Sequence, residues 1–454
     1  MSKRPSIGAA FLLGTSTIAA AALIPTLAQA QVTTSSIRGS VQTETGVAVP
    51  NATVRLFNTE TGFNRTVTTD NNGSFGLRNL SVSGAYDVEV TAPNLRGERV
   101  EDVRLSLGEE SQLVFQLSAD DFADEIIVVG QRQVVADLAI GPNASFGLDT
   151  LESVPAINRN INDVIRLDPR ISLDVTNSDA INCGGANNRF NSLTLDGVRF
   201  NDNFGLNANG YPTERIPFSY DAVEQVSVEL APFGVEYGGF SACNINAVTK
   251  SGTNELHGYL FGDYTNDGLR SNSLEGNTIQ SGEFDEYRYG IGIGGPIIKD
   301  KLFFFAAYEK LEGVNLFDRG PIGSGAVNEV NITQAELDEI VRISNDIYGY
   351  DPGGLPTNFD NEDEKFLAKI DWNITDRQRA SFTYNYNNGF NIVESDGDLD
   401  ELEFSNHLYE RGAKLNSYSG ALYSDWNDNF STEFRIGLTE LNNRQDTVGG
   451  TDFG

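Results

Sequence analysis

The sequence predicts a mainly β protein built from successive domains. Between residues 33 and 118, short apolar strands alternate with turns rich in Gly, Asn and Pro, which is the pattern of a small β-domain. After Lys250 the strands become long and alternate between apolar and polar residues. The composition agrees, because 46 Gly, 27 Phe and 16 Tyr accompany only 2 Cys, 2 His and 1 Met in 454 residues.

The charge balance disfavours a nucleic-acid-binding protein. Asp and Glu total 64 against 32 Lys and Arg, a formal net charge of −32, whereas affinity for nucleic acid comes largely from cationic side chains that neutralise phosphates. The few His, Cys and Met residues leave little material for metal or redox chemistry. We therefore expect no enzyme, no cofactor and no resident metal.

The first thirty residues predict a secretory signal peptide. Lys3 and Arg4 form a basic start, the stretch from Ile7 to Ile24 is apolar and small, and Ala28-Gln29-Ala30 is a cleavage site before Gln31. A membrane anchor is the alternative for this stretch. No later segment approaches the ~20 apolar residues of a transmembrane helix, so a membrane-embedded form of this protein has to be a β-barrel.

Residues 31–118 form the first predicted domain after the signal peptide. The expected strands are Ile37–Val41, Thr53–Phe57, Tyr86–Val90 and Leu113–Leu117, with a Gly-containing turn at Asp70–Phe75. The motifs Pro50-Asn51-Ala52-x-Val54 and Thr69-Asp70-Asn71-Asn72-Gly73-Ser74-Phe75 resemble the carboxypeptidase regulatory-like domain, which implies a transthyretin-like β-sandwich. No zinc-ligand set accompanies it, so we expect a structural or partner-docking role rather than peptidase activity.

A linker at residues 119–135 contains the apolar peptide Glu125-Ile126-Ile127-Val128-Val129. An extended apolar peptide can add to the edge of another protein's sheet through main-chain hydrogen bonds. The peptide resembles the TonB box of TonB-dependent outer-membrane receptors, which implies binding of a TonB-type energy-coupling protein by Glu125, Ile126, Ile127, Val128 and Val129. A packed terminal strand is the alternative.

Residues 136–252 resemble the plug domain of the same receptors, an α+β fold. The matching motifs, in the family's order, are Leu151–Pro155, Asn162–Pro169, Asn191–Val198, Ala222–Glu229, Tyr237–Gly239 and Asn246–Gly252. Together with the N-terminal domain, Asn203–Leu206 and Ile216–Tyr220 resemble the Oar-like subgroup. The family's usual Arg-Gly-Pro is replaced by Leu230-Ala231-Pro232, which puts any plug–barrel contact made by that arginine in doubt.

The two cysteines, Cys183 and Cys243, both lie in the predicted plug. Export would place them in an oxidising compartment, which favours a disulfide between them, and two separate buried thiols are the alternative. In the chain-entropy model a bridge of this length would stabilise the plug by ~4 kcal/mol.

The segment 253–454 predicts the first strands of a transmembrane antiparallel β-barrel. Along Lys365–Trp372, Ser381–Asn387 and Phe430–Thr439, apolar residues alternate with polar ones, as a wall between lipid and water requires. A soluble sandwich shows the same alternation. Gly290, Gly292 and Gly294 on the inner face would leave room for a plug.

Two further segments bear on function. Residues 311–364 are too long for a hairpin turn and contain a capping box at Thr333–Glu336, which predicts an extracellular loop with a helix. Asp396, Asp398 and Asp400 resemble the start of a calcium loop, but Glu401 replaces its turn glycine, so a solvated acidic loop is favoured over a weak cation site. Neither His257 nor His407 has a sequence partner that marks a catalytic triad.

The resemblance implies an outer-membrane receptor for energy-coupled active uptake of an unknown extracellular substrate, in contact with outer-membrane lipid. A surface protein for adhesion or secretion is the alternative, and a periplasmic binding module is a third. The family barrel has more strands than 202 residues can supply, so we expect the chain to be a fragment or a truncated reading frame.

Overall fold

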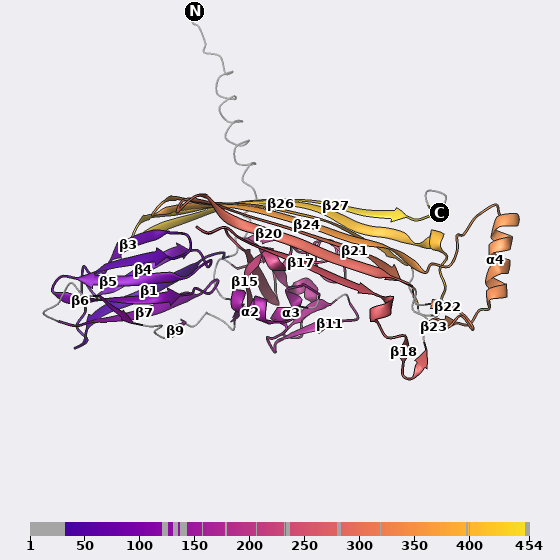
Figure 1. Cartoon of the computed structure of the whole chain (residues 1–454), viewed down its shortest axis with the longest axis horizontal. Helices are drawn as coiled ribbons and strands as arrows, with labels where there is room; N and C mark the ends of the chain where they lie inside the picture. The colour runs from indigo at the N-terminus through magenta and orange to yellow at the C-terminus, as the bar shows by residue number, and fades with distance from the viewer. Residues whose placement is uncertain are drawn as a thin grey trace, which may run out of the picture.

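The computed structural model confirms the mainly β fold. It describes residues 32–119, 126–129, 135–136, 143–156, 158–177, 179–205, 207–230, 232, 237–278, 283–317, 319–395, 398 and 400–449. The expected signal peptide, Glu125 and Asp396 lie outside these residues. The described residues form a two-sheet N-terminal domain, a central α+β unit and a long sheet that spreads across both (Figure 1).

The N-terminal domain, residues 32–119, packs two sheets around one core. The sheet orders are β4-β1-β7-β9 and β3-β2-β5-β6-β8. The strands are β1 (Ser35–Thr43), β2 (Thr53–Asn58), β3 (Asn64–Thr68), β4 (Ser74–Leu80), β5 (Tyr86–Ala92), β6 (Leu95–Val103) and β7 (Glu110–Leu117), joined by β8 (Ile126–Val129) and β9 (Val135–Ala136). Alternate residues of β2 and β4 point into the shared core, so the predicted sandwich is confirmed.

The turn at Asp70–Phe75 forms as the sequence predicts. The Asp70 Oδ1 atom accepts hydrogen bonds from the backbone N–H groups of Asn72 and Ser74, each at 2.8 Å. Gly73 has a φ of 73°, a conformation that glycine adopts without steric cost. The turn therefore feeds the chain directly into β4.

The central unit, residues 143–252, has a mixed sheet with the order β10-β15-β16-β13-β14 and a separate β11-β12 hairpin. Its strands are β10 (Asn143–Phe146), β11 (Ile171–Asp174), β12 (Ala180–Cys183), β13 (Ser192–Leu195), β14 (Val198–Arg199), β15 (Val223–Leu230) and β16 (Cys243–Thr249). Its helical turns are α2 (Leu148–Ser153), α3 (Asn162–Ile165), η1 (Asn188–Phe190) and η2 (Tyr220–Ala222). Every residue of β16 is buried, because this strand lies between β15 and β13.

The long sheet is an antiparallel meander of seven strands. They are β17 (His257–Asn266), β20 (Asp285–Ile298), β21 (Leu302–Leu316), β24 (Asn358–Thr375), β25 (Gln378–Val393), β26 (Tyr409–Asn427) and β27 (Phe430–Thr447). Among the described residues, β17 and β27 pair on one side only, so the sheet is not closed into a barrel.

The two faces of the long sheet differ as the alternation predicts. Ile370, Trp372 and Phe382 on the outer face are 37%, 44% and 50% exposed. The neighbouring Lys369 and Thr383 point inward, where the central unit buries them. The inner face therefore carries polar residues together with apolar ones such as Phe305 and Leu367, and the central unit covers them. The outer face is apolar and exposed, as a lipid-facing wall requires.

The space beside the inner glycines of β20, which was expected to leave room for a plug, is occupied by aromatic rings of the neighbouring strand. A Cβ atom at Gly290 would lie 2.4 Å from the Phe261 ring, and one at Gly292 would lie 2.2 Å from the Tyr259 ring. Both aromatic residues belong to the neighbouring strand β17 and pair directly with these glycines. The space left by the glycines is thus filled by rings of β17, and Tyr259 in turn packs against the core of the central unit.

The two ends of the long sheet carry connections of different length. At one end the strands are joined by short turns at residues 299–301, 376–377 and 428–429, and at the other by segments 267–284, 317–357 and 394–408. These longer segments contain η3 (Asp267–Leu269), β18 (Ser273–Leu274), β19 (Asn277–Thr278), β22 (Arg319–Pro321), β23 (Asn328–Val330), α4 (Gln334–Asp346) and η4 (Ser405–His407). The N-terminal domain lies at the short-turn end and α4 at the opposite end (Figure 1).

The predicted loop helix is present as α4. The Thr333 Oγ1 atom accepts from the Glu336 backbone N–H at 3.3 Å, and the Glu336 Oε2 atom accepts from the Thr333 backbone N–H at 2.8 Å, which completes the capping box. The strands extend further than expected, since β21 ends at Leu316 and β24 begins at Asn358. In the part of the chain that the structure describes, no helix is long and apolar enough to cross a membrane.

Candidate functional site

The apolar peptide after the N-terminal domain forms the edge strand β8. Residues Ile126–Val129 pair in parallel with Gly97–Val100 of β6, in the register Gly97 with Ile126 and Val100 with Val129. Glu125 lies outside the described residues. The segment is therefore an added strand at the outer edge of the β3-β2-β5-β6-β8 sheet.

The two cysteines of the central unit form a disulfide. Cys183 at the end of β12 and Cys243 at the start of β16 have Cα atoms 5.9 Å apart and are 60 residues apart in the chain. Both are buried, at 2% and 0% exposure. The bond joins the small β11-β12 hairpin to the buried strand of the main sheet.

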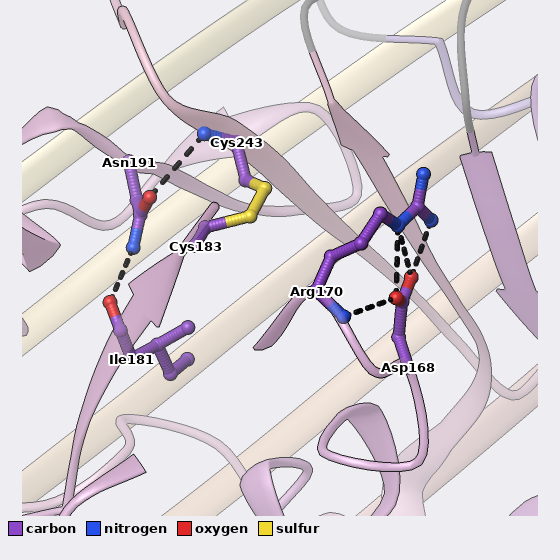
Figure 2. Close-up of a disulfide and its surroundings, with 6 residues drawn as sticks. All are labelled: Asp168, Arg170, Ile181, Cys183, Asn191 and Cys243. Atoms are coloured by element: carbon purple, nitrogen blue, oxygen red, sulfur yellow. Dashed lines mark hydrogen bonds and ion pairs between the residues drawn. A yellow bond between two sulfur atoms is a disulfide. The ribbon is translucent and has the colours of Figure 1, made fainter. Parts of the chain in front are cut away.

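Hydrogen bonds fix the chain around this disulfide (Figure 2). The side chain of Asn191 donates to the Ile181 carbonyl at 2.7 Å, and its oxygen accepts from the Cys243 backbone N–H at 3.3 Å. Just before the same hairpin, the Arg170 guanidinium donates to the Asp168 carboxylate at 2.8 Å, and this hydrogen bond holds the pKa of Asp168 below its usual value. The disulfide therefore lies among side chains that hydrogen-bond to the backbone and to one another.

The central unit is fastened to the long sheet by polar contacts from residues 214–219. The Arg411 guanidinium of β26 donates to both carboxylate oxygens of Glu214, at 2.7 and 2.9 Å. Ser219 donates to Glu309 of β21 at 2.6 Å, and Glu309 is paired with Lys365 of β24 at 3.2 Å. This is a bidentate ion pair in which the carboxylate belongs to the central unit and the guanidinium belongs to the long sheet.

A second polar cluster fastens the β13–β14 turn to the same sheet. The Asp196 carboxylate accepts from the hydroxyl groups of Thr249 at 2.7 Å and Thr383 at 2.9 Å. Lys369 lies 3.9 Å from Asp196 and donates to the Thr249 carbonyl at 2.9 Å. Residues other than Leu230-Ala231-Pro232 therefore hold the central unit to the long sheet. Ala231 itself lies outside the described residues.

A cavity of about 850 Å³ lies where the N-terminal domain, the central unit and β17 meet. Its lining includes Glu60 of the N-terminal domain, Glu224 of β15 and Lys250. Burial raises the pKa of Glu224 to about 7. The side chains around the cavity carry both signs of charge and do not select one class of ligand.

One polar cluster of the loop segment 394–408 contains Ser395, Glu403 and His407. The Ser395 hydroxyl oxygen lies 2.9 Å from Nδ1 and 3.4 Å from Nε2 of His407, and a Glu403 carboxylate oxygen lies 3.3 Å from Nδ1. His257 is exposed and lies near Thr253. Over the described part of the chain, no group of three or more His, Cys, Asp or Glu side chains could hold a metal ion, and the proposed calcium-type loop is only partly described, since Asp396 falls outside.

The sequence matches two known domain families. Residues 36–118 match the carboxypeptidase regulatory-like domain, and residues 248–316 match the outer membrane beta barrel domain. A segment is 34% identical over 135 residues to the TonB-dependent transporter Oar of Myxococcus xanthus. That segment covers 28% of this chain and 12% of Oar.

Two of the solved structures that match are an outer-membrane transporter and a receptor. The outer membrane transporter YddB of Escherichia coli has a TM-score of 0.49 at 15% identity, and the match covers 68% of this chain and 41% of that one. The enterobactin complex of the ferric enterobactin receptor PfeA of Pseudomonas aeruginosa, an R480A mutant, has a TM-score of 0.45 at 16% identity, with coverage of 66% and 41%. The chain thus spans less than half the length of these relatives.

The two domain matches lie in the order that the sequence motifs indicate, with the regulatory-like domain first and the barrel strands after the central unit. The segment shared with Oar is a sequence likeness rather than a likeness of fold alone. On this evidence the chain is similar in sequence to the Oar-like TonB-dependent receptors.

Proposed function

We propose that the protein is an outer-membrane receptor that takes up an extracellular substrate with energy from a TonB-type coupling protein. The coupling protein would bind residues 125–129. The observation that carries this proposal is β8, because Ile126–Val129 already pair with a sheet edge through the main chain. Strand addition of this kind supplies affinity from backbone hydrogen bonds, so a coupling protein with a free sheet edge could replace β6 as the partner.

The position of β8 in the chain supports a mechanical role. The described chain resumes after β9 at β10, an edge strand of the central sheet that pairs with β15 over only four residues, Asn143–Phe146. On its C-terminal side a pull on β8 would therefore reach first β9, which pairs with β7 over two residues, and then β10. The disulfide at Cys183 would limit how far remodelling can spread, since it ties the chain to the buried strand β16.

The connections of the long sheet support an orientation in the membrane. Outer-membrane barrels have short periplasmic turns and longer extracellular loops. The N-terminal domain, which lies at the short-turn end, would then be periplasmic and α4 extracellular. We also propose that the seven strands are part of a larger barrel, because unpaired backbone at β17 and β27 is unfavourable in lipid.

Proline at position 127 tests the coupling role. Ile127→Pro removes a backbone N–H and should abolish both binding of the coupling protein's C-terminal domain and energy-dependent accumulation. Ile127→Val keeps the backbone donor and is the matched control, which should behave as the unsubstituted protein. Unchanged accumulation in Ile127→Pro would refute the transporter mechanism, and retained adhesion with no accumulation in any form would favour the adhesion or secretion alternative.

A further inference from the structure

The N-terminal domain has a hydrophobic core of its own. Its main core cluster consists only of residues between Ile37 and Leu117, and the cluster of the central unit and the long sheet consists only of residues between Phe146 and Leu415. A small cluster of Val82, Leu107 and Val248 joins the two parts. The domain can therefore leave the rest of the molecule without exposing its own core.

The deepest polar contact between the domain and the long sheet is an ion pair. The Arg65 guanidinium of β3 lies 2.7 Å from the Asp425 carboxylate near the short-turn end of β26, and the two side chains are 5% and 6% exposed. Asn79 donates to the same carboxylate at 3.2 Å, and Arg379 donates to the Asn79 carbonyl at 3.3 Å. The domain is thus held to the rim of the sheet by charged and polar groups.

Other contacts place the domain over the strands of the central unit. The Leu107 backbone N–H donates to the buried Gln225 Oε1 atom of β15 at 2.8 Å. The Asn254 backbone N–H, just before β17, donates to the Glu60 carbonyl at 2.8 Å. These contacts and Val248 of β16 lie on the side where the sheet has its short turns. The domain covers that end of the central unit as a cap, by which we mean residues 32–118 in this docked position.

The chemistry of these contacts favours reversible docking. A buried ion pair gains little net free energy, because removing two charges from water offsets most of their attraction. Undocking would return Arg65 and Asp425 to water, and among the described residues it would separate a small apolar cluster of Val82, Leu107 and Val248. Residues 126–129 and 135–136 pair with the domain itself as β8 and β9, so they would move away together with it.

We propose that the N-terminal domain is a detachable cap on the periplasmic side of the central unit, and that the Arg65–Asp425 ion pair sets the balance between docked and undocked forms. The cap covers this side of the central unit until a pull on β8 draws the domain away. This last step rests on the proposed coupling function, whereas docking itself does not.

Three valines of the cap make docking measurable by thiol labelling. Val82 is 7% exposed and packs only in the joining cluster, Val54 is 0% exposed in the domain's own core, and Val47 is 62% exposed. Each is replaced singly by Cys in cells that express the protein, and a small charged maleimide is the probe. The native cysteines are bonded to each other and do not compete.

In the resting protein we expect rapid labelling of Val47→Cys and slow labelling of both Val82→Cys and Val54→Cys. Adding Asp425→Asn should speed the labelling of Val82→Cys by at least about tenfold, because Arg65 is then buried without a counter-charge. Val54→Cys should stay slow, which separates undocking from unfolding. Reversing the pair as Arg65→Asp with Asp425→Arg should restore the protection of Val82→Cys.

The outcomes separate the cap from the coupling function. Equal labelling of Val82→Cys and Val47→Cys at rest, or no response to Asp425→Asn, would overturn the cap. Slower labelling of Val82→Cys after a protonophore would support release by an energised partner. If Asp425→Asn acts as expected but the protonophore has no effect, the docked cap stands and energy-driven release is refuted together with the proposed coupling.

Discussion

Removing the disulfide should destabilise the central unit and leave the N-terminal domain unchanged. The bond closes a span of 60 residues between Cys183 and Cys243. In the chain-entropy model a loop of this length restricts the unfolded state by about 4 kcal/mol. Because both cysteines are buried, replacing them by Ala adds a small loss of packing to this entropic effect.

Hydrogen exchange of the purified protein measures this effect strand by strand. In the double variant Cys183→Ala/Cys243→Ala, and in the reduced unsubstituted protein, the opening free energy of β12 and β16 should fall by about 3 to 4 kcal/mol. Strands β1 and β2 are the internal control, since their core is separate. A fall below about 1 kcal/mol in β12 and β16, or an equal fall in β1, would refute the reasoning.

Four further predictions address single side chains. Leu56→Ala, at a fully buried site, should lower the stability of the N-terminal domain by about 2 to 5 kcal/mol in denaturant titration. Arg411→Ala should lower the opening free energy of the central unit by roughly 2 kcal/mol, measured by hydrogen exchange, because Glu214 loses its partner. Arg411→Lys should restore only part of this free energy, because lysine cannot form the bidentate pair. Thr333→Ala should destabilise α4 by about 1 kcal/mol, measured by exchange of its amides, while Thr333→Ser retains the cap. The raised pKa of Glu224 means that its protonated form stabilises the fold, so this stabilisation should be lost as the pH rises from about 4.5 through about 7, and Glu224→Gln should flatten that part of the pH profile of melting.

The local features of the fold could be predicted from the sequence. Strand positions, the turn at Asp70, the helix cap at Thr333 and the two faces of the long strands all follow from spacing over a few residues. Such patterns depend on residues that are close in the chain, so they can be recognised without knowledge of the tertiary structure. The strand β6 was missed because Arg96, Glu98, Arg99 and Glu101 interrupt its apolar pattern.

The contacts that hold the domains together could not be predicted in this way. Glu214 and Arg411 are 197 residues apart, and nothing near either residue identifies its partner. Each is an ordinary charged residue until the fold brings them together. The same holds for Arg65 and Asp425, whose burial is a property of the docked domains rather than of their own strands. Only the resemblance of Ile216–Tyr220 to the Oar-like subgroup marked this contact region in the sequence.

The order of elements along the chain determines the order in which a pull on β8 would act. On the N-terminal side the pull meets the N-terminal domain, which is held by several polar contacts and a small apolar cluster. On the C-terminal side it meets first β9, which pairs with β7 over two residues, and then β10, an edge strand with four paired residues. Contacts from Glu214 and Asp196 lie beyond the first cysteine in the chain. The contacts nearest the point of attachment are thus the most easily broken ones, and the disulfide separates them from those that fasten the central unit to the wall. An unchanged rate of protease cleavage near β10 after pulling on β8 with an immobilised partner would contradict this order.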